Sequence, residues 1–215
     1  MLFRSAEVGA ERELDAVVDL ADDDRELQAI VDHTGLTADH VRLLGELAPH
    51  LDDLTAEITQ GFYAHVLASG ALRAIIDRHS SVERLETTLA QYVRTLWSGV
   101  YDDRTAAHRV VIGKVHDRIQ LPLGAYLGAF VQIDRVVMGR IVERVAEPEL
   151  LAEALVAWRT LTQTDVAIVS QAFIDSRDAR LSELLETLSA ASEEVSAQTE
   201  EATRSEEHTS ELQSH

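Results

Sequence analysis

The sequence contains no cysteine among its 215 residues, which excludes a disulfide framework, a thiolate metal site and an iron–sulfur centre. Only three prolines and ten glycines are present, so few residues interrupt long helices. Basic residues are also scarce, because 19 Lys and Arg stand against 38 Asp and Glu, for a formal net charge of −19. Nucleic acids and anionic lipids both require a basic face, so we predict no nucleic-acid partner and no docking on anionic lipid.

The hydrophobic residues, 46% of the chain, are sufficient for a core, but none of their runs approaches a membrane span of about 18 residues. The amino-terminal segment soon becomes acidic and has no long apolar stretch, so it does not resemble a secretory signal. Apolar residues recur at helical spacing, and no useful length of strand-like alternation is present. We therefore predict an all-α, cytoplasmic protein without a membrane span.

Glycine, proline and capping residues divide the sequence into predicted helices. Residues 1–34 are expected to be a helical extension, in which acidic residues at 22–24 interrupt an apolar stripe that ends at Gly35. Thr37 is expected to cap the next helix, and Pro49 to begin the one after it. The later predicted helices span about 49–70, 72–78, 82–99 with Ser80 or Ser81 as its cap, 105–121, 122–145 and 148–178.

Residues 179–203 are predicted to be the start of a coiled-coil helix, because apolar or small residues recur there every three and four positions. Three heptads is the minimum length for this signature, and a solvated terminal helix is the alternative. The seam consists of Leu181, Leu184, Leu188, Ala191, Val195, Gln198 and Ala202.

The last residues, 204–215, resemble one reading frame of a widely used sequencing adapter without a mismatch. We interpret this segment as an artefact and exclude it from the fold argument, and a genuine acidic tail is the alternative. On the first interpretation the natural chain continues past Thr203 into an output module that is missing here.

Most of the nine histidines lie among polar neighbours near predicted helix ends, where a surface or capping role is the simplest interpretation. No pair has the spacing of zinc or di-iron ligands, and no phosphate-binding glycine loop is present. His116 differs, because Ile112, Gly113 and Ile119 place it on the apolar face of a helix that ends before Pro122. Spacing alone leaves two roles open for it, a satisfied core histidine and an axial heme ligand.

The segment from Arg109 to Phe130, RVVIGKVHDRIQLPLGAYLGAF, resembles the proximal segment of globin-coupled sensors, globins of the protoglobin-related type. In that family an Ile-Gly-x-x-His run supplies the proximal heme ligand, and a following helix carries a Tyr that contacts the imidazole. The resemblance covers residues 35–178 and implies a sensor globin fold followed by a coiled-coil helix. It also implies heme b as the cofactor, with His116 on the iron and Tyr126 beside the imidazole.

The resemblance extends to the distal side of the heme site. Phe62 and Tyr63 stand where the family has a Phe-Tyr pair whose Tyr hydroxyl faces bound oxygen. Leu85 and Thr88, three residues apart, match the apolar residue and the Thr that aerotaxis members place over the iron. The resemblance thus implies Tyr63 and Thr88 as oxygen-binding residues. The implied cofactor-binding set is Phe62, Tyr63, Leu85, Thr88, Leu89, Ile112, His116, Ile119, Tyr126 and Phe130.

The implied function is a sensor of oxygen or another diatomic gas, with no catalytic residues and no enzymatic activity. A homodimer is expected through the helices at 122–145 and 148–178, whose apolar content exceeds what one globin core requires. The residues behind this expectation are Val136, Val137, Ile141, Val142, Leu155, Leu161, Val166 and Ile168. Chemotaxis signalling proteins are the expected partners, because Ser-Ala-x-x-Glu-Glu at 189–194 and 196–201 resembles methylatable sites of chemoreceptor helices.

Three other functions stay open at this point. The chain could regulate an enzyme, such as a diguanylate cyclase, that lies in the missing output module. It could be a heme-free helical scaffold, like stress-response proteins that keep a globin fold without a cofactor. It could also use heme to react with oxygen or nitric oxide as a catalyst.

Overall fold

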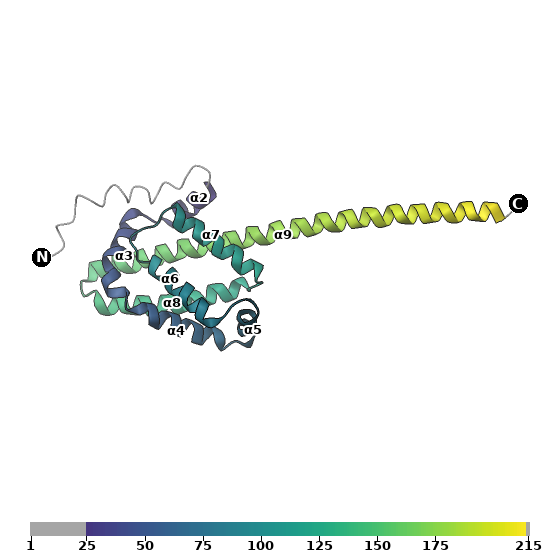
Figure 1. The fold of residues 1–215 in the computed structure, drawn as a ribbon. Helices are drawn as coiled ribbons and strands as arrows, with labels where there is room; N and C mark the ends of the chain where they lie inside the picture. Colours follow the sequence, from purple (N-terminus) through teal and green to yellow (C-terminus); the bar gives the residue numbers. More distant parts are fainter. Residues whose placement is uncertain (1–24, 214–215) are drawn as a thin grey trace. The chain divides into compact units, whose positions relative to one another are not determined.

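The computed structural model describes residues 25–213, with side chains described over residues 25–200, and every regular element in that part of the chain is a helix. The predicted helical stripe over residues 1–24 lies outside the described residues. The helices are α2 (Arg25–Thr34), α3 (Ala38–Leu51), α4 (Leu54–Leu67), α5 (Gly70–His79), α6 (Val82–Thr95), α7 (Asp103–Arg118), α8 (Leu123–Arg144) and α9 (Pro148–Gln213), as Figure 1 shows.

Side-chain caps set several of the helix starts. Thr37 caps α3 by accepting from the His40 backbone, and the His40 side chain accepts from the Thr37 backbone in return. Ser81 caps α6 by accepting from the backbone of Arg84. The predicted caps at Thr37 and Ser81 are confirmed.

The prediction that Pro49 begins a helix is wrong, because Pro49 lies inside the last turn of α3 and the next helix starts at Leu54. A proline there removes only one backbone bond, and α3 ends two residues later at Leu51. The helix expected from Thr105 starts earlier, because the Asp102 side chain accepts from the Thr105 backbone at 2.9 Å.

The core lies between the helices from α2 to the first part of α9. Helix α4 packs against both α6 and α8. Trp97 and Trp158 meet in the core with ring centroids 6.3 Å apart. Each indole N–H donates to a carboxylate: Trp97 to Asp52 at 2.8 Å and Trp158 to Asp134 at 3.0 Å. Two large rings are therefore buried without an unsatisfied polar atom.

Helix α7 comes very close to α9 at Gly113. A Cβ at Gly113 would lie 2.8 Å from the Ala172 Cβ and would also collide with the Val169 carbonyl oxygen. Only glycine fits this crossing, and the crossing lies one turn before His116 on the same helix. The glycine therefore determines how close the His116 segment lies to α9.

Helix α9 is continuous from Pro148 to Gln213, but the chain divides by its contacts into two units between Ile174 and Asp175. In the second unit the heptad residues Leu181, Leu188 and Val195 are 55–67% exposed in the single chain. None of the described helices is both long enough and apolar enough to cross a membrane.

The residues behind the predicted dimer contact divide into three groups, of which Val136, Leu155 and Val166 are half-buried against the core. Val137, Ile141, Leu161 and Ile168 are buried in the core of the single chain, so their apolar character already has an explanation there. Val142 is 56% exposed. Further exposed apolar residues on the same two helices are Leu127, Val131 and Val156.

Candidate functional site

A cavity of about 170 Å³ lies among α4, α6, α7 and α8. Its walls are mainly aliphatic and aromatic, with one imidazole and one threonine among them. The lining residues are Phe62, Tyr63, Leu85, Thr88, Leu89, Tyr92, Ile112, His116, Tyr126, Phe130 and Ile133. An apolar cavity with few polar groups is the usual form of a cofactor or small-molecule site.

The cavity brings together nine of the ten residues in the predicted cofactor-binding set. Ile119 is the exception, because it follows the end of α7 and does not line the cavity. The sequence analysis missed Tyr92 and Ile133. Helical spacing would have indicated both, since Tyr92 is four residues beyond Thr88 and Ile133 is three beyond Phe130.

His116 is held in one tautomer by its own helix. Its Nδ1 lies 2.8 Å from the Ile112 carbonyl oxygen, which can only accept, so Nδ1 carries the proton. Burial lowers the pKa of the His116 imidazole, and the bond to Ile112 opposes this only in part. Nε2 has no hydrogen-bond partner among residues 25–200 and is not sealed in the core. It is therefore a neutral lone-pair donor at the cavity.

Helix α7 ends one turn after His116 through a Schellman motif. The Leu121 N–H donates to the His116 carbonyl at 3.0 Å, and the Gln120 N–H donates to the Asp117 carbonyl at 2.8 Å. Gln120 has a φ of 58°, a left-handed conformation that glycine adopts at lower cost. The bonded carbonyl fixes the end of α7, and with it the backbone that carries the imidazole.

Tyr63 presents a free hydroxyl group to the cavity. The residue is largely buried, but its hydroxyl oxygen stays accessible at the cavity and makes no hydrogen bond to protein within the described part of the chain. Burial, reinforced by the charge of Glu86, raises the pKa of the Tyr63 phenol, so it stays protonated. The Phe62 ring packs against it at 5.2 Å between centroids, nearly perpendicular. Tyr63 is therefore a hydrogen-bond donor whose ring is positioned by packing against Phe62.

Thr88 lines the same cavity, but its hydroxyl proton is already used in a hydrogen bond. The Thr88 Oγ1 donates to the Arg84 carbonyl at 3.0 Å, one turn back in α6. In this rotamer it can accept a hydrogen bond from a cavity ligand but has no second proton to donate. Tyr63 can therefore donate a hydrogen bond to a cavity ligand, whereas Thr88 in this rotamer can only accept one.

A row of aromatic rings extends from His116 along the cavity wall. The Tyr126 ring lies 5.3 Å from the imidazole and 6.3 Å from Phe130, between centroids. Phe130 in turn lies 6.4 Å from the Tyr92 ring at an angle of 85°. The two contacts of Phe130 have the edge-to-face geometry that stabilises aromatic clusters, and the Tyr126 ring is tilted against the imidazole. The imidazole is therefore fixed on one side by its helix and on another by Tyr126.

Comparison with known proteins agrees with this arrangement. The Protoglobin family profile matches residues 23–179, most of the chain and all of the cavity. The chain belongs to the Protoglobin family.

Two known proteins are similar to this protoglobin, one in sequence and one in structure. The heme-based aerotactic transducer HemAT of Halobacterium salinarum is 27% identical over 175 residues, which cover 77% of this chain and 36% of that protein. This protoglobin therefore spans about a third of the transducer's length. The solved globin domain of the Geobacter sulfurreducens globin-coupled sensor superposes with a TM-score of 0.64 at 21% identity, covering 68% of this chain and 96% of that chain. The predicted all-α globin fold is confirmed.

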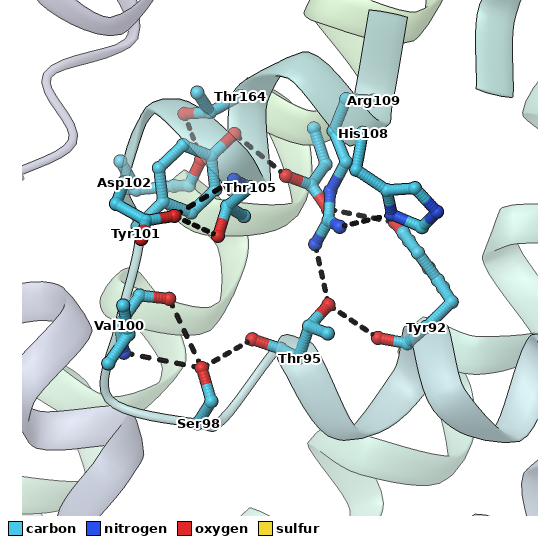
Figure 2. Close-up of polar contacts among 12 residues, drawn as sticks. Tyr92, Thr95, Ser98, Val100, Tyr101, Asp102, Thr105, His108, Arg109 and Thr164 are labelled. Atoms are coloured by element: carbon cyan, nitrogen blue, oxygen red, sulfur yellow. Dashed lines mark hydrogen bonds and ion pairs between the residues drawn. The ribbon is translucent and has the colours of Figure 1, made fainter. Parts of the chain in front are cut away.

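Beside the cavity, this protoglobin buries an ion pair between α7 and α9. Arg109 Nε donates to Asp165 at 2.8 Å, with both side chains at most 1% exposed. Asp165 also accepts from the hydroxyls of Tyr92 at 2.9 Å and Tyr101 at 2.8 Å. A further guanidinium nitrogen donates to Thr95 at 2.8 Å (Figure 2). The described part of the chain has no buried side-chain nitrogen or oxygen without a hydrogen bond.

The charges of this pair set the state of its neighbours. Burial raises the pKa values of Tyr92 and Tyr101, and the Asp165 carboxylate raises them further, so both hydroxyls remain donors. Burial disfavours the charged form of Arg109, but the attraction of Asp165 prevails and raises the pKa of the guanidinium. Arg109 therefore stays charged, and Tyr92 and Tyr101 stay protonated, across the physiological pH range.

Proposed function

We propose that this protoglobin is a heme-based sensor of oxygen or another diatomic gas. The observation that carries the proposal is one cavity that contains both the unpartnered Nε2 of His116 and the unpartnered hydroxyl of Tyr63. A heme site requires an axial lone pair on one side and a dry pocket with a polar donor on the other. The name of the H. salinarum relative, a heme-based aerotactic transducer, supports the same conclusion.

The residues present fit heme b. His116 would hold the iron through Nε2, since its Nδ1 proton is bonded to Ile112 and its ring is neutral. Aliphatic and aromatic side chains would pack against the macrocycle, with Phe62 and Phe130 among them. Heme supplies an iron centre with one open position at which a diatomic gas binds reversibly. We assign no catalytic residue to this site.

Tyr63 would determine which gas is retained. A hydrogen bond to a partner that carries charge is worth about 1.5–3 kcal/mol, or roughly 10- to 150-fold in affinity. The Tyr63 donor would therefore favour a gas that is polar when bound, such as oxygen, over a less polar one, such as carbon monoxide. Thr88 is the second oxygen-contacting residue of the proposal, and it can donate only after its hydroxyl leaves the Arg84 carbonyl.

The output of the sensor would pass through a homodimer. Leu127, Val131 and Val142 on α8 are exposed apolar residues in the single chain and would meet a second copy there. The exposed heptad residues from Leu181 would extend the pairing as a coiled coil. Chemotaxis signalling proteins would be the partners that receive this signal.

The test is an absorption spectrum of the purified chain after loading with hemin, reduction and exposure to oxygen. We expect a Soret band that shifts reversibly with oxygen and that is lost or grossly altered in His116→Ala. His50→Ala is the matched control, because His50 lies in the last turn of α3 and does not line the cavity. Stable folding without hemin uptake would refute the sensor and favour a heme-free helical scaffold.

A second measurement tests the role of the distal donor. In Tyr63→Phe we expect oxygen to dissociate roughly 10- to 150-fold faster, the loss of one hydrogen bond to a charged partner. Carbon monoxide binding should change far less, because that ligand is less polar. Equal changes for both gases would show that the phenol acts through the shape of the cavity alone.

A further inference from the structure

Two buried tyrosines donate to the same carboxylate in the core, and only one of them lines the cavity. Tyr92 and Tyr101 bond to different oxygens of Asp165, at 2.9 and 2.8 Å. The Tyr92 ring forms part of the cavity wall, whereas Tyr101 lies between α6 and α7 and does not line the cavity. The carboxylate itself is on α9, the helix that continues into the second unit.

Tyr92 is held on several sides, so its ring and hydroxyl must move together. Phe130 packs against it edge-on, and the Arg109 guanidinium lies 4.6 Å from its ring centroid. The backbone carbonyl of Tyr92 accepts from Thr95, whose Oγ1 also accepts from Arg109. Figure 2 shows Tyr92, Thr95 and Arg109 converging in this way.

We propose that Tyr92 is the positioning residue through which the contents of the cavity act on α9. The inference rests on the proposed gas-sensing function and adds the residue that carries its signal. A group that shifts in the cavity displaces the Tyr92 ring, and the hydroxyl displaces Asp165 with it. The buried carboxylate cannot exchange this donor for water, because its side chain is fully buried. The movement therefore passes to α9 between Trp158 and Ile174.

The arrangement supplies a matched pair of variants. Tyr92→Phe and Tyr101→Phe each remove one hydroxyl that donates to Asp165, and each keeps the aromatic ring. Both tyrosines are buried, so the structural cost of the two changes is similar. A purely structural network predicts the same behaviour from both variants, whereas coupling through the cavity wall predicts a difference.

The experiment is hydrogen–deuterium exchange on the full chain loaded with hemin, in the deoxy and oxygen forms, for wild type and both variants. We expect an oxygen-dependent change in exchange over residues 158–174 in wild type and in Tyr101→Phe. We expect Tyr92→Phe to lose most of that difference when it is compared at an oxygen concentration that saturates its own Soret response. Thermal unfolding of each variant checks that both remain folded to the same extent.

The outcomes separate this inference from the function on which it rests. If the Soret band responds to oxygen but Tyr92→Phe keeps the full exchange difference, or both variants lose it equally, the assignment of Tyr92 is overturned alone. The same follows if wild type shows an oxygen-dependent spectrum and no exchange difference in α9. If the wild-type spectrum does not respond to any diatomic gas, the proposed function fails and this inference fails with it.

Discussion

Replacing Asp165 with asparagine removes the negative charge from the buried network while nearly preserving its shape. The carboxylate accepts from Arg109, Tyr92 and Tyr101, and asparagine offers one oxygen and one NH₂ group to the same three donors. One donor must therefore face another donor or turn away. Arg109, at most 1% exposed, is left without a counter-charge.

The burial of Arg109 determines how much of the free energy of unfolding the variant should lose. Removing one member of a buried ion pair costs about 3–5 kcal/mol, because the remaining charge is uncompensated. Globular domains are stable by only about 5–15 kcal/mol, so the variant should lose about a fifth or more of its free energy of unfolding. For a domain of this size the midpoint of thermal unfolding should fall by roughly 6–20 °C.

The assay is urea unfolding followed by circular dichroism, with two comparison variants. Asp53→Asn is the surface control, since Asp53 pairs with Arg140 at 2.9 Å but its side chain is 62% exposed. Such a pair is worth about 0–1 kcal/mol. The double variant Arg109→Met with Asp165→Asn removes both charges but keeps a polar side chain beside the two tyrosine hydroxyls, and should recover part of the lost stability.

Two results would refute this reasoning. A loss of less than about 1 kcal/mol in Asp165→Asn would mean that the carboxylate is not the ionised partner of Arg109. A double variant as unstable as the single one would mean that the cost comes from lost packing rather than from an unpaired charge.

Three further changes have defined outcomes. Gly113→Ala should destabilise the chain by roughly 1–3 kcal/mol in urea unfolding, because the new methyl collides with α9 at Val169, and it should weaken hemin uptake. Gln120→Gly should stabilise it by about 0.5–1 kcal/mol, because glycine adopts a φ of 58° without strain. Burial raises the pKa of the Asp134 carboxyl, despite its bond from the Trp158 indole, so ionised Asp134 is less favourable folded than unfolded. Asp134→Asn should therefore be more stable than wild type at pH 7.5, and the gain should shrink as pH falls toward 4.

Each of these has a result that would contradict it. A Gly113→Ala variant with wild-type stability would mean that α7 and α9 separate at no cost. A destabilised Gln120→Gly variant would mean that the glutamine side chain contributes more than its backbone conformation costs. A stability difference for Asp134→Asn that does not change with pH would show that the burial of the charge is not its cause.

Most of the candidate site was implied by the resemblance to globin-coupled sensors, and helical spacing, a local property, is consistent with it. His116 lies with Ile112 on one helix face, and Leu85, Thr88 and Leu89 lie on another, so each helix contributes its own members to the cavity wall. Tyr92 was missed although it continues the second stripe. Ile119 belongs to the predicted set because it continues the apolar stripe that contains His116. The Schellman motif ends α7 at Arg118, so Ile119 lies beyond the helix.

The sequence by itself determined the helical class, the caps at Thr37 and Ser81 and the stripes of apolar residues, since these depend on neighbours within one or two turns. Only the tertiary structure decided which apolar residues are buried in the core, as for Val137 and Ile141, and which remain exposed, as for Val142. Burial depends on helices that pack from distant parts of the chain. For the same reason no local pattern could pair Arg109 with an aspartate 56 residues away or join Tyr92 to α9.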